Sequence, residues 1–126
     1  MMKTLFDYLN ARINSFSFAF QGIKYLIQNE GNAKIHLLAT VLVVFFSFLF
    51  QINQSEWINI VFAIAFVWAA ESFNTAIELS INLVQPTYHP LAKAIKDVTA
   101  AGVLIASISA AITGLLIFIP YISKYF

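Results

Sequence analysis

The sequence predicts an all-α membrane protein with an N-terminal amphipathic helix on the membrane surface, followed by three membrane-spanning helices. Of 126 residues, 60% are hydrophobic and only 10% are charged, and a soluble domain of this size could not bury so much apolar surface. Three long apolar runs cover residues 35–52, 57–84 and 98–122. A spanning helix needs about 20 apolar residues, and it must satisfy its own backbone hydrogen bonds in lipid. We expect one domain over residues 1–126.

The segment before these runs, residues 4–29, has a mixed composition. Apolar side chains such as Leu5, Leu9 and Ile13 recur at helical spacing among polar ones, which predicts an amphipathic helix. We expect it to lie on the membrane surface, with a break near Asn14–Ser15. A helix that packs on other protein is the alternative, and both can hold in an oligomer.

The basic residues predict the orientation in the membrane. Six of the seven precede the first run or separate the second from the third, namely Lys3, Arg12, Lys24, Lys34, Lys93 and Lys96. Only Lys124 follows the third run. Because Lys and Arg concentrate in cytoplasmic segments, we expect a multi-pass protein of the plasma membrane with its N-terminus in the cytoplasm and its C-terminus outside.

Several classes of protein are excluded or disfavoured. A net charge of +1 gives no basic face for nucleic acid, and the absence of Cys excludes disulfides, thiolate metal sites and Cys nucleophiles. We expect no cleavable signal peptide, because an amphipathic stretch follows Lys3. Neither GxxxxGK[ST] nor GxGxxG occurs, and His36 and His89 lack the close spacing of a zinc site.

Polar residues on the second run are the main functional signal. They are Glu71, Asn74, Thr75, Glu78 and Asn82, and their spacing places them along one stripe of a helix. A carboxylate at mid-membrane costs ~2.5–3.5 kcal/mol on insertion scales, so such residues normally face a bundle interior and mark a site. A purely structural polar stripe is the alternative.

Depth separates the two carboxylates. At ~1.5 Å per residue, Glu71 lies ~21 Å and Glu78 ~31 Å from Trp57 at the outer side. With a hydrocarbon core of ~30 Å, Glu78 reaches the cytoplasmic boundary and Glu71 lies about two turns deeper. A cytoplasmic ligand could therefore reach Glu78, and a lipid head group could meet Glu71.

Two further polar segments belong to the cytoplasmic side, residues 30–36 and 86–97. Carboxylates at Glu30 and Glu78 suit Mg²⁺, which prefers oxygen ligands and substrate phosphates, and Lys96 could meet a phosphate.

Simpler interpretations of these two segments stay open. Glu30 could be merely interfacial, and Asn32 could cap the first span. Lys93 and Lys96 could set the topology by binding lipid phosphates. Tyr88 and His89 could be ordinary loop residues.

The run Glu71-Ser-Phe-Asn74-Thr-Ala-Ile-Glu78, followed by Lys96-Asp97 and an Ala-rich helix, resembles the prokaryotic diacylglycerol kinase and undecaprenol kinase family. The resemblance covers about residues 15–110. It includes Glu30, the stretch from Asn32 to His36 and the spacing to Tyr88-His89, and Phe18, Ala19 and Gly22 fit the family's surface helix.

This resemblance implies a trimer with active sites between subunits, which uses Mg²⁺ and moves the γ-phosphate of ATP to a lipid hydroxyl. Glu71 would be the general base, Asn74 would orient the site, and Glu30 and Glu78 would hold the metal. The nucleotide-binding residues would be Arg12, Phe18, Glu30, Glu78, Thr87, Tyr88, His89, Lys96 and Asp97. The lipid-binding residues would be Asn32, His36 and Glu71.

The sequence also departs from the family pattern. Asn82 stands where the family usually has Asp, which removes one carboxylate and puts a role for that position in doubt. Ala11 occupies a position that is basic in some relatives, and Arg12 could substitute for it. At Phe18, relatives can carry Tyr.

Other functions are weaker interpretations. Intramembrane carboxylates also occur in small cation or proton transporters, but this stripe converges on a cytoplasmic segment with Lys96 and Asp97. Only hydrophobicity favours a non-catalytic assembly subunit. Diacylglycerol and undecaprenol both carry one hydroxyl on an apolar body. Within the resemblance, undecaprenol is favoured by two features, the Asn-Thr-Ala-Ile-Glu form and the Tyr-His-Pro-Leu-Ala-Lys run.

Overall fold

The computed structural model describes residues 4–125, so that Lys3 of the predicted cytoplasmic set lies outside the described residues. The chain forms four helices, α1 (Leu5–Asn29), α2 (Gly31–Leu49), α3 (Gln54–Val84) and α4 (Pro90–Ile122). Within the described part, α2, α3 and α4 are long and apolar enough to cross a membrane. The predicted all-helical class is thus confirmed, and the three predicted apolar runs lie in three helices that could each span a membrane.

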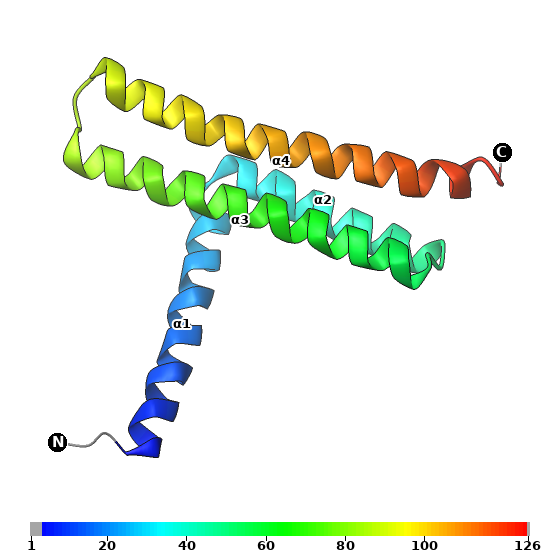
Figure 1. The fold of residues 1–126 in the computed structure, drawn as a ribbon, viewed down its shortest axis with the longest axis horizontal. Helices are drawn as coiled ribbons and strands as arrows, with labels where there is room; N and C mark the ends of the chain where they lie inside the picture. Colours follow the sequence, from blue (N-terminus) through cyan, green and yellow to red (C-terminus); the bar gives the residue numbers. More distant parts are fainter. Residues whose placement is uncertain (1–3, 126) are drawn as a thin grey trace.

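The helices α2, α3 and α4 lie side by side, and α1 leaves them at a steep angle (Figure 1). The α2–α3 turn and the C-terminus lie towards one end, and the α1–α2 junction and the α3–α4 connection lie towards the other. Helix α3 extends well past the start of α2. The α3–α4 hairpin therefore projects beyond the α1–α2 junction.

Helix α1 starts with a reciprocal cap and runs without interruption. The Asp7 N–H donates to Thr4 Oγ1 over 3.3 Å, and the Thr4 N–H donates to Asp7 Oδ2 over 3.0 Å. Hydrogen bonds from the Thr4 hydroxyl and N–H hold the pKa of Asp7 below its usual value. The predicted break near Asn14–Ser15 is wrong, because the Ser15 hydroxyl donates to the Ala11 carbonyl within a continuous helix. A position on the membrane surface stays a prediction.

The turn between α2 and α3 closes with two backbone hydrogen bonds. The Ile52 N–H donates to the Ser47 carbonyl over 3.2 Å, and the Gln51 N–H donates to the Phe48 carbonyl over 3.1 Å. Gln51 has a φ of 51°. These are the bonds of a Schellman motif, whose left-handed position normally holds Gly.

The end of the bundle near this turn is the best packed. Ile52, Ile60 and Ile117 form a buried cluster. The Tyr121 hydroxyl of α4 donates to Glu56 Oε2 at the start of α3 over 2.7 Å. This end therefore ties α4 to the first turn of α3.

Two helix starts differ from the prediction. Helix α2 begins at Gly31 with Glu30 as its N-cap, so the interpretation of Asn32 as a cap is wrong, and Asn32 lies inside the first turn. Helix α4 begins at Pro90 rather than at residue 98. His89 caps it, and a first-position Pro costs no hydrogen bond and has a helical φ.

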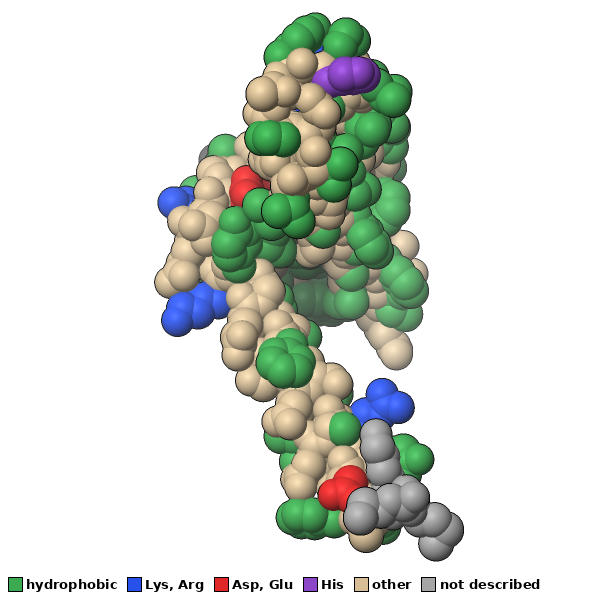
Figure 2. Space-filling view, turned by 90° about the vertical axis from the view of Figure 1, so that its left-hand side faces the viewer, with side chains coloured by type: hydrophobic (Ala, Val, Ile, Leu, Met, Phe, Trp, Pro, Cys, Tyr) green, Lys and Arg blue, Asp and Glu red, His purple; other side chains and the backbone are tan. Residues whose placement is uncertain are grey.

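Most of the apolar surface of the spans is not covered by the chain itself. Only 11% of the residues in the most apolar window of α2 are buried, and 22% in that of α3. Figure 2, which looks at the molecule from the end with the α3–α4 connection, shows hydrophobic side chains gathered along the flank of the bundle. This surface suits lipid or further copies of the chain.

Candidate active site

The site centres on Glu71, which is only 1% exposed although it carries a carboxylate. His36 on α2 approaches it from the neighbouring helix, with Nε2 at 3.8 Å from Glu71 Oε2, beyond hydrogen-bond length. Neither of these atoms has a hydrogen-bond partner within residues 4–125, and the same is true of the buried Thr75 hydroxyl oxygen. Buried polar atoms are normally paired, so this group of three is the strongest candidate for a ligand site.

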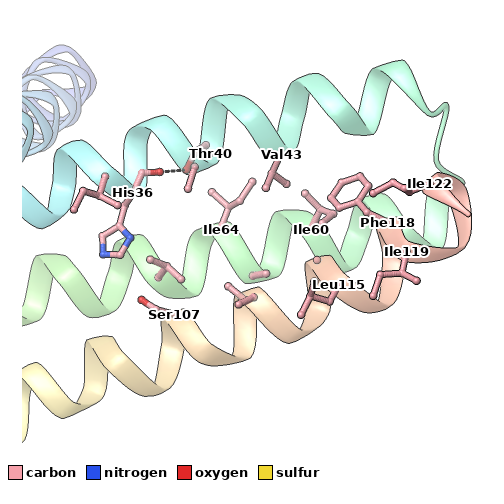
Figure 3. A pocket seen from close by; sticks show the side chains of 17 residues that line it. His36, Thr40, Val43, Ile60, Ile64, Ser107, Leu115, Phe118, Ile119 and Ile122 are labelled. Carbon is pink, nitrogen blue, oxygen red and sulfur yellow. Dashed lines mark hydrogen bonds between the residues drawn. The ribbon is translucent and has the colours of Figure 1, made fainter. Parts of the chain in front are cut away.

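A hydrogen-bonded pair fixes α2 on α3 beside this group. The Trp68 indole N–H donates to Thr40 Oγ1 over 3.1 Å, and the Thr40 hydroxyl donates to the His36 carbonyl over 2.7 Å (Figure 3). Because Thr40 lies one turn from His36, the pair sets which face of α2 meets Glu71. The contact joins positions 28 apart, and no sequence motif indicates it.

Glu30 and Glu78, the predicted metal ligands, are both half-buried. Glu30 is the junction of α1 and α2, and its carboxylate makes no capping bond. Glu78 lies two turns from Glu71 on the same face of α3, with Asn74 between them. Both carboxylates are near enough to Glu71 to interact with it electrostatically.

The oxygen donors present fit Mg²⁺ better than an ion that needs a protein cage. Among residues 4–125 no group of three or more His, Cys, Asp or Glu side chains could hold a metal. Mg²⁺ is commonly bound through one or two carboxylates, while substrate phosphates and waters complete its shell. Glu30 and Glu78 supply that number.

Lys96 and Asp97, predicted to bind nucleotide, have separate partners. Lys96 Nζ donates to Asn82 Oδ1 over 2.6 Å, which joins α4 to α3. Asp97 pairs with Lys93 one turn earlier. The uncharged side-chain amide of Asn82 therefore positions Lys96. This contact lies ~16 Å along α3 from Glu71, at ~1.5 Å per residue.

The connection between α3 and α4 holds the other predicted nucleotide ligands. The Gln85 side-chain amide donates to Thr87 Oγ1 over 2.9 Å, and Tyr88 is 80% exposed. His89 accepts the Leu91 N–H at Nδ1 over 3.2 Å, so it has a structural role as the cap of α4.

Three predicted site residues are exposed, and two of them lie away from the α3–α4 connection within one chain. Arg12 and Phe18 are exposed on α1, which leads away from the α3–α4 connection (Figures 1 and 2). Asn32 is exposed on the first turn of α2.

An apolar cavity of about 580 Å³ lies between α2, α3 and α4. Its walls are almost entirely apolar side chains such as Val43, Ile64 and Leu115, and His36 lies at one end of it (Figure 3). It therefore has the character of a site for hydrocarbon next to the Glu71 group.

Comparison with known proteins agrees with these features. The family model described as prokaryotic diacylglycerol kinase matches residues 17–118. The chain is 38% identical over 112 residues to the undecaprenol kinase of Bacillus subtilis, across 89% of this chain and 91% of that protein. It is 33% identical over 107 residues to the diacylglycerol kinase of Synechocystis sp., across 84% of this chain and 61% of that protein. With its three apolar helices and the polar stripe of α3, this chain belongs to the prokaryotic diacylglycerol kinase family.

Proposed function

We propose that this protein is an ATP-dependent lipid kinase that transfers the γ-phosphate of ATP to the hydroxyl of a membrane lipid. Its membership of a kinase family supports the reaction class. The observation that carries the proposal is the buried Glu71 carboxylate, unpaired within the described residues on a helix able to span a membrane. A lipid alcohol approaches from the bilayer, so a proton acceptor on a helix able to span the membrane can reach its hydroxyl.

In this proposal Glu71 accepts the proton of the lipid hydroxyl. Phosphoryl transfer needs positioning and charge neutralisation more than covalent chemistry, and an apolar setting makes a carboxylate a stronger proton acceptor. Asn74, half-buried one turn away, orients the reacting groups. His36 is close enough to hydrogen-bond Glu71 after a small movement.

The nucleotide lies between Glu71 and the cytoplasmic end of α3 in this arrangement. Glu30 and Glu78 hold Mg²⁺, which would neutralise charge on the phosphates. Lys96 has an uncharged amide, that of Asn82, as its partner on α3, and with Asp97 it binds the nucleotide. Arg12, Phe18, Thr87, Tyr88 and His89 complete that site.

Undecaprenol is the favoured lipid, and diacylglycerol is the alternative. The Bacillus subtilis relative named undecaprenol kinase matches nearly end to end, and the cavity beside His36 is apolar enough for a hydrocarbon chain. The test is transfer of radiolabelled phosphate from ATP to each purified lipid in parallel. We expect labelled undecaprenyl phosphate, and transfer to neither lipid would overturn the proposal.

We also propose that the site is shared between subunits of a trimer. The resemblance implies it, and the exposed positions of Arg12 and Phe18 on α1 support it, since one chain leaves them outside the cluster. Native mass spectrometry in mild detergent should give a trimer. A fully active monomer would contradict shared sites.

A further inference from the structure

Thr75 differs from other hydroxyl residues of α2 and α3. On α3, Ser72 and Ser80 each donate to the carbonyl one turn earlier. The fully buried Ser47 on α2 does the same, over 2.7 Å to Val43. Thr75 is only 4% exposed, yet its hydroxyl oxygen has no partner among residues 4–125. An unpaired buried hydroxyl costs about 1–3 kcal/mol, which calls for a function.

The Thr75 side chain lines a cavity of about 330 Å³ between α1 and α3. Small residues leave this space open, including Ala19 and Gly22 on α1 and Ala76 on α3. A Cβ atom built on Gly22 would meet nothing within 4 Å. The cavity is therefore wide enough at Thr75 for part of another molecule.

Thr75 and Glu71 can bind one oxygen atom together. They are one turn apart on the same face of α3, where side chains are neighbours, and an oxygen of each has no partner within the described residues, so one ligand oxygen can hydrogen-bond to both. An alcohol has one O–H and two lone pairs. It can donate to Glu71, accept from Thr75 and keep one lone pair for attack.

We propose that Thr75 holds the acceptor hydroxyl of the lipid, and that the α1–α3 cavity takes the carbons next to that hydroxyl. This inference rests on the proposed kinase function. In the transfer step the alcohol oxygen forms a bond to the γ-phosphorus, the bond from that phosphorus to the bridging oxygen breaks and releases ADP, and the alcohol proton passes to Glu71. Thr75 is then a catalytic residue, because it touches the reacting oxygen.

Thr75→Val is the sharpest test, because it keeps the shape and removes only the hydroxyl. Loss of one hydrogen bond to the substrate should raise the KM for lipid about tenfold, with the KM for ATP unchanged. Thr75→Ser should stay close to wild type. The melting temperature of Thr75→Val should be equal or higher, because an unpaired buried hydroxyl is removed.

The control is Ser47→Ala, which removes a buried hydroxyl that is already bonded. It should leave the KM for both substrates unchanged. A lower melting temperature for Thr75→Val with normal lipid kinetics would make Thr75 structural. A shifted pH profile of kcat at unchanged lipid KM would mean that Thr75 acts only through Glu71. Both results overturn the proposal while leaving the kinase function intact, whereas an inactive wild type overturns the function itself.

The cavity is tested separately at Gly22. Gly22→Leu should fill the space and raise the KM for lipid, and Gly22→Ala should have little effect; both favour a helix more than Gly does. Unchanged lipid kinetics in Gly22→Leu would exclude the α1–α3 cavity as the site of the carbons next to the lipid hydroxyl. If Gly22→Leu instead alters the oligomer in native mass spectrometry, the occupant is a helix of another subunit, and the proposal is wrong.

Discussion

Glu71 is the residue on which the proposed chemistry depends most. Glu71→Gln keeps the size and the packing but removes the proton acceptor, so kcat should fall by about 10²–10⁴-fold with little change in the KM for ATP. Steady-state kinetics with both substrates varied will measure this. Glu56→Gln is the matched control, because Glu56 lies on the same helix near the opposite end and binds Tyr121; it should keep full activity.

A near-normal kcat in Glu71→Gln would show that Glu71 is not the base. If Glu71→Gln weakens only nucleotide binding, Glu71 instead belongs to the ATP-binding site. The two results are separable because an interaction made only in the transition state lowers kcat without changing ground-state binding.

The two half-buried carboxylates at Glu30 and Glu78 make a different prediction. Glu30→Gln and Glu78→Gln should each weaken binding of Mg·ATP at least tenfold, as expected when a hydrogen-bonded or ligating charge is lost, and should abolish turnover. Binding of metal-free ATP should change little. Titration of a fluorescent ATP analogue with and without Mg²⁺ measures both, and Asp7→Asn on the distant start of α1 is the control.

Wild-type Mg·ATP affinity in both variants would remove the metal assignment. If the variants bind ATP more weakly both with and without Mg²⁺, the two carboxylates shape the nucleotide site itself and do not act through the metal.

At this scale the sequence predicts which residues share a stripe but not which residues meet across helices. The spacing of Glu71 and Glu78 is sufficient to place both on one face of α3. The approach of His36 to Glu71 depends on how α2 is rotated and shifted against α3. The same holds for Lys96 and Asn82, which the sequence does not pair and which the structure joins by a hydrogen bond.

Among the elements, the α2–α3 turn carries local strain. Gln51 is the only residue other than Gly at positive φ within residues 4–125, and a side chain there costs about 1–2 kcal/mol. Replacing Gln51 by Gly removes this strain, but part of the gain in stability is lost because Gly has more backbone freedom in the unfolded chain. Gln51→Gly should therefore raise the free energy of unfolding by about 0.5–1 kcal/mol.

Unfolding in mixed detergent micelles measures this change. Gln21→Gly is the matched control, because Gln21 is exposed well inside α1 and the substitution should destabilise by about 1 kcal/mol. Destabilisation by Gln51→Gly would mean that its side chain contributes more than the strained backbone costs.

Helix ends were less predictable than helix existence. Apolar runs indicate where hydrocarbon must be, so they place the spans, but helices continue into water where capping permits. For this reason α4 starts at Pro90, behind the His89 cap, well before its apolar run. Likewise Asn14 and Ser15 are weak helix formers, yet α1 passes through them, and the Ser15 hydroxyl is satisfied by the Ala11 carbonyl.

Taken as a whole molecule, the chain has an apolar end and a polar end. Ile52, Ile60 and Ile117 form the buried cluster near the α2–α3 turn, whereas the end with α1 holds the polar groups, which one cavity adjoins at His36 and the other at Thr75. Composition is sufficient to predict the number of spans. It does not predict assembly, because side chains that face lipid and side chains that face another subunit are apolar alike.

The length of helix α3 should make the activity depend on the thickness of the membrane. Its 31 residues contain neither Gly nor Pro, so it is a stiff rod of ~46 Å, longer than a hydrocarbon core of ~30 Å. Trp57 near its start favours one interface, which fixes the depth of Glu71 against the opposite one. In thicker bilayers hydrophobic mismatch should draw Glu71 away from the head groups. Turnover in vesicles of increasing acyl-chain length should therefore be highest at one bilayer thickness, at which α3 holds Glu71 at the depth of the lipid hydroxyl.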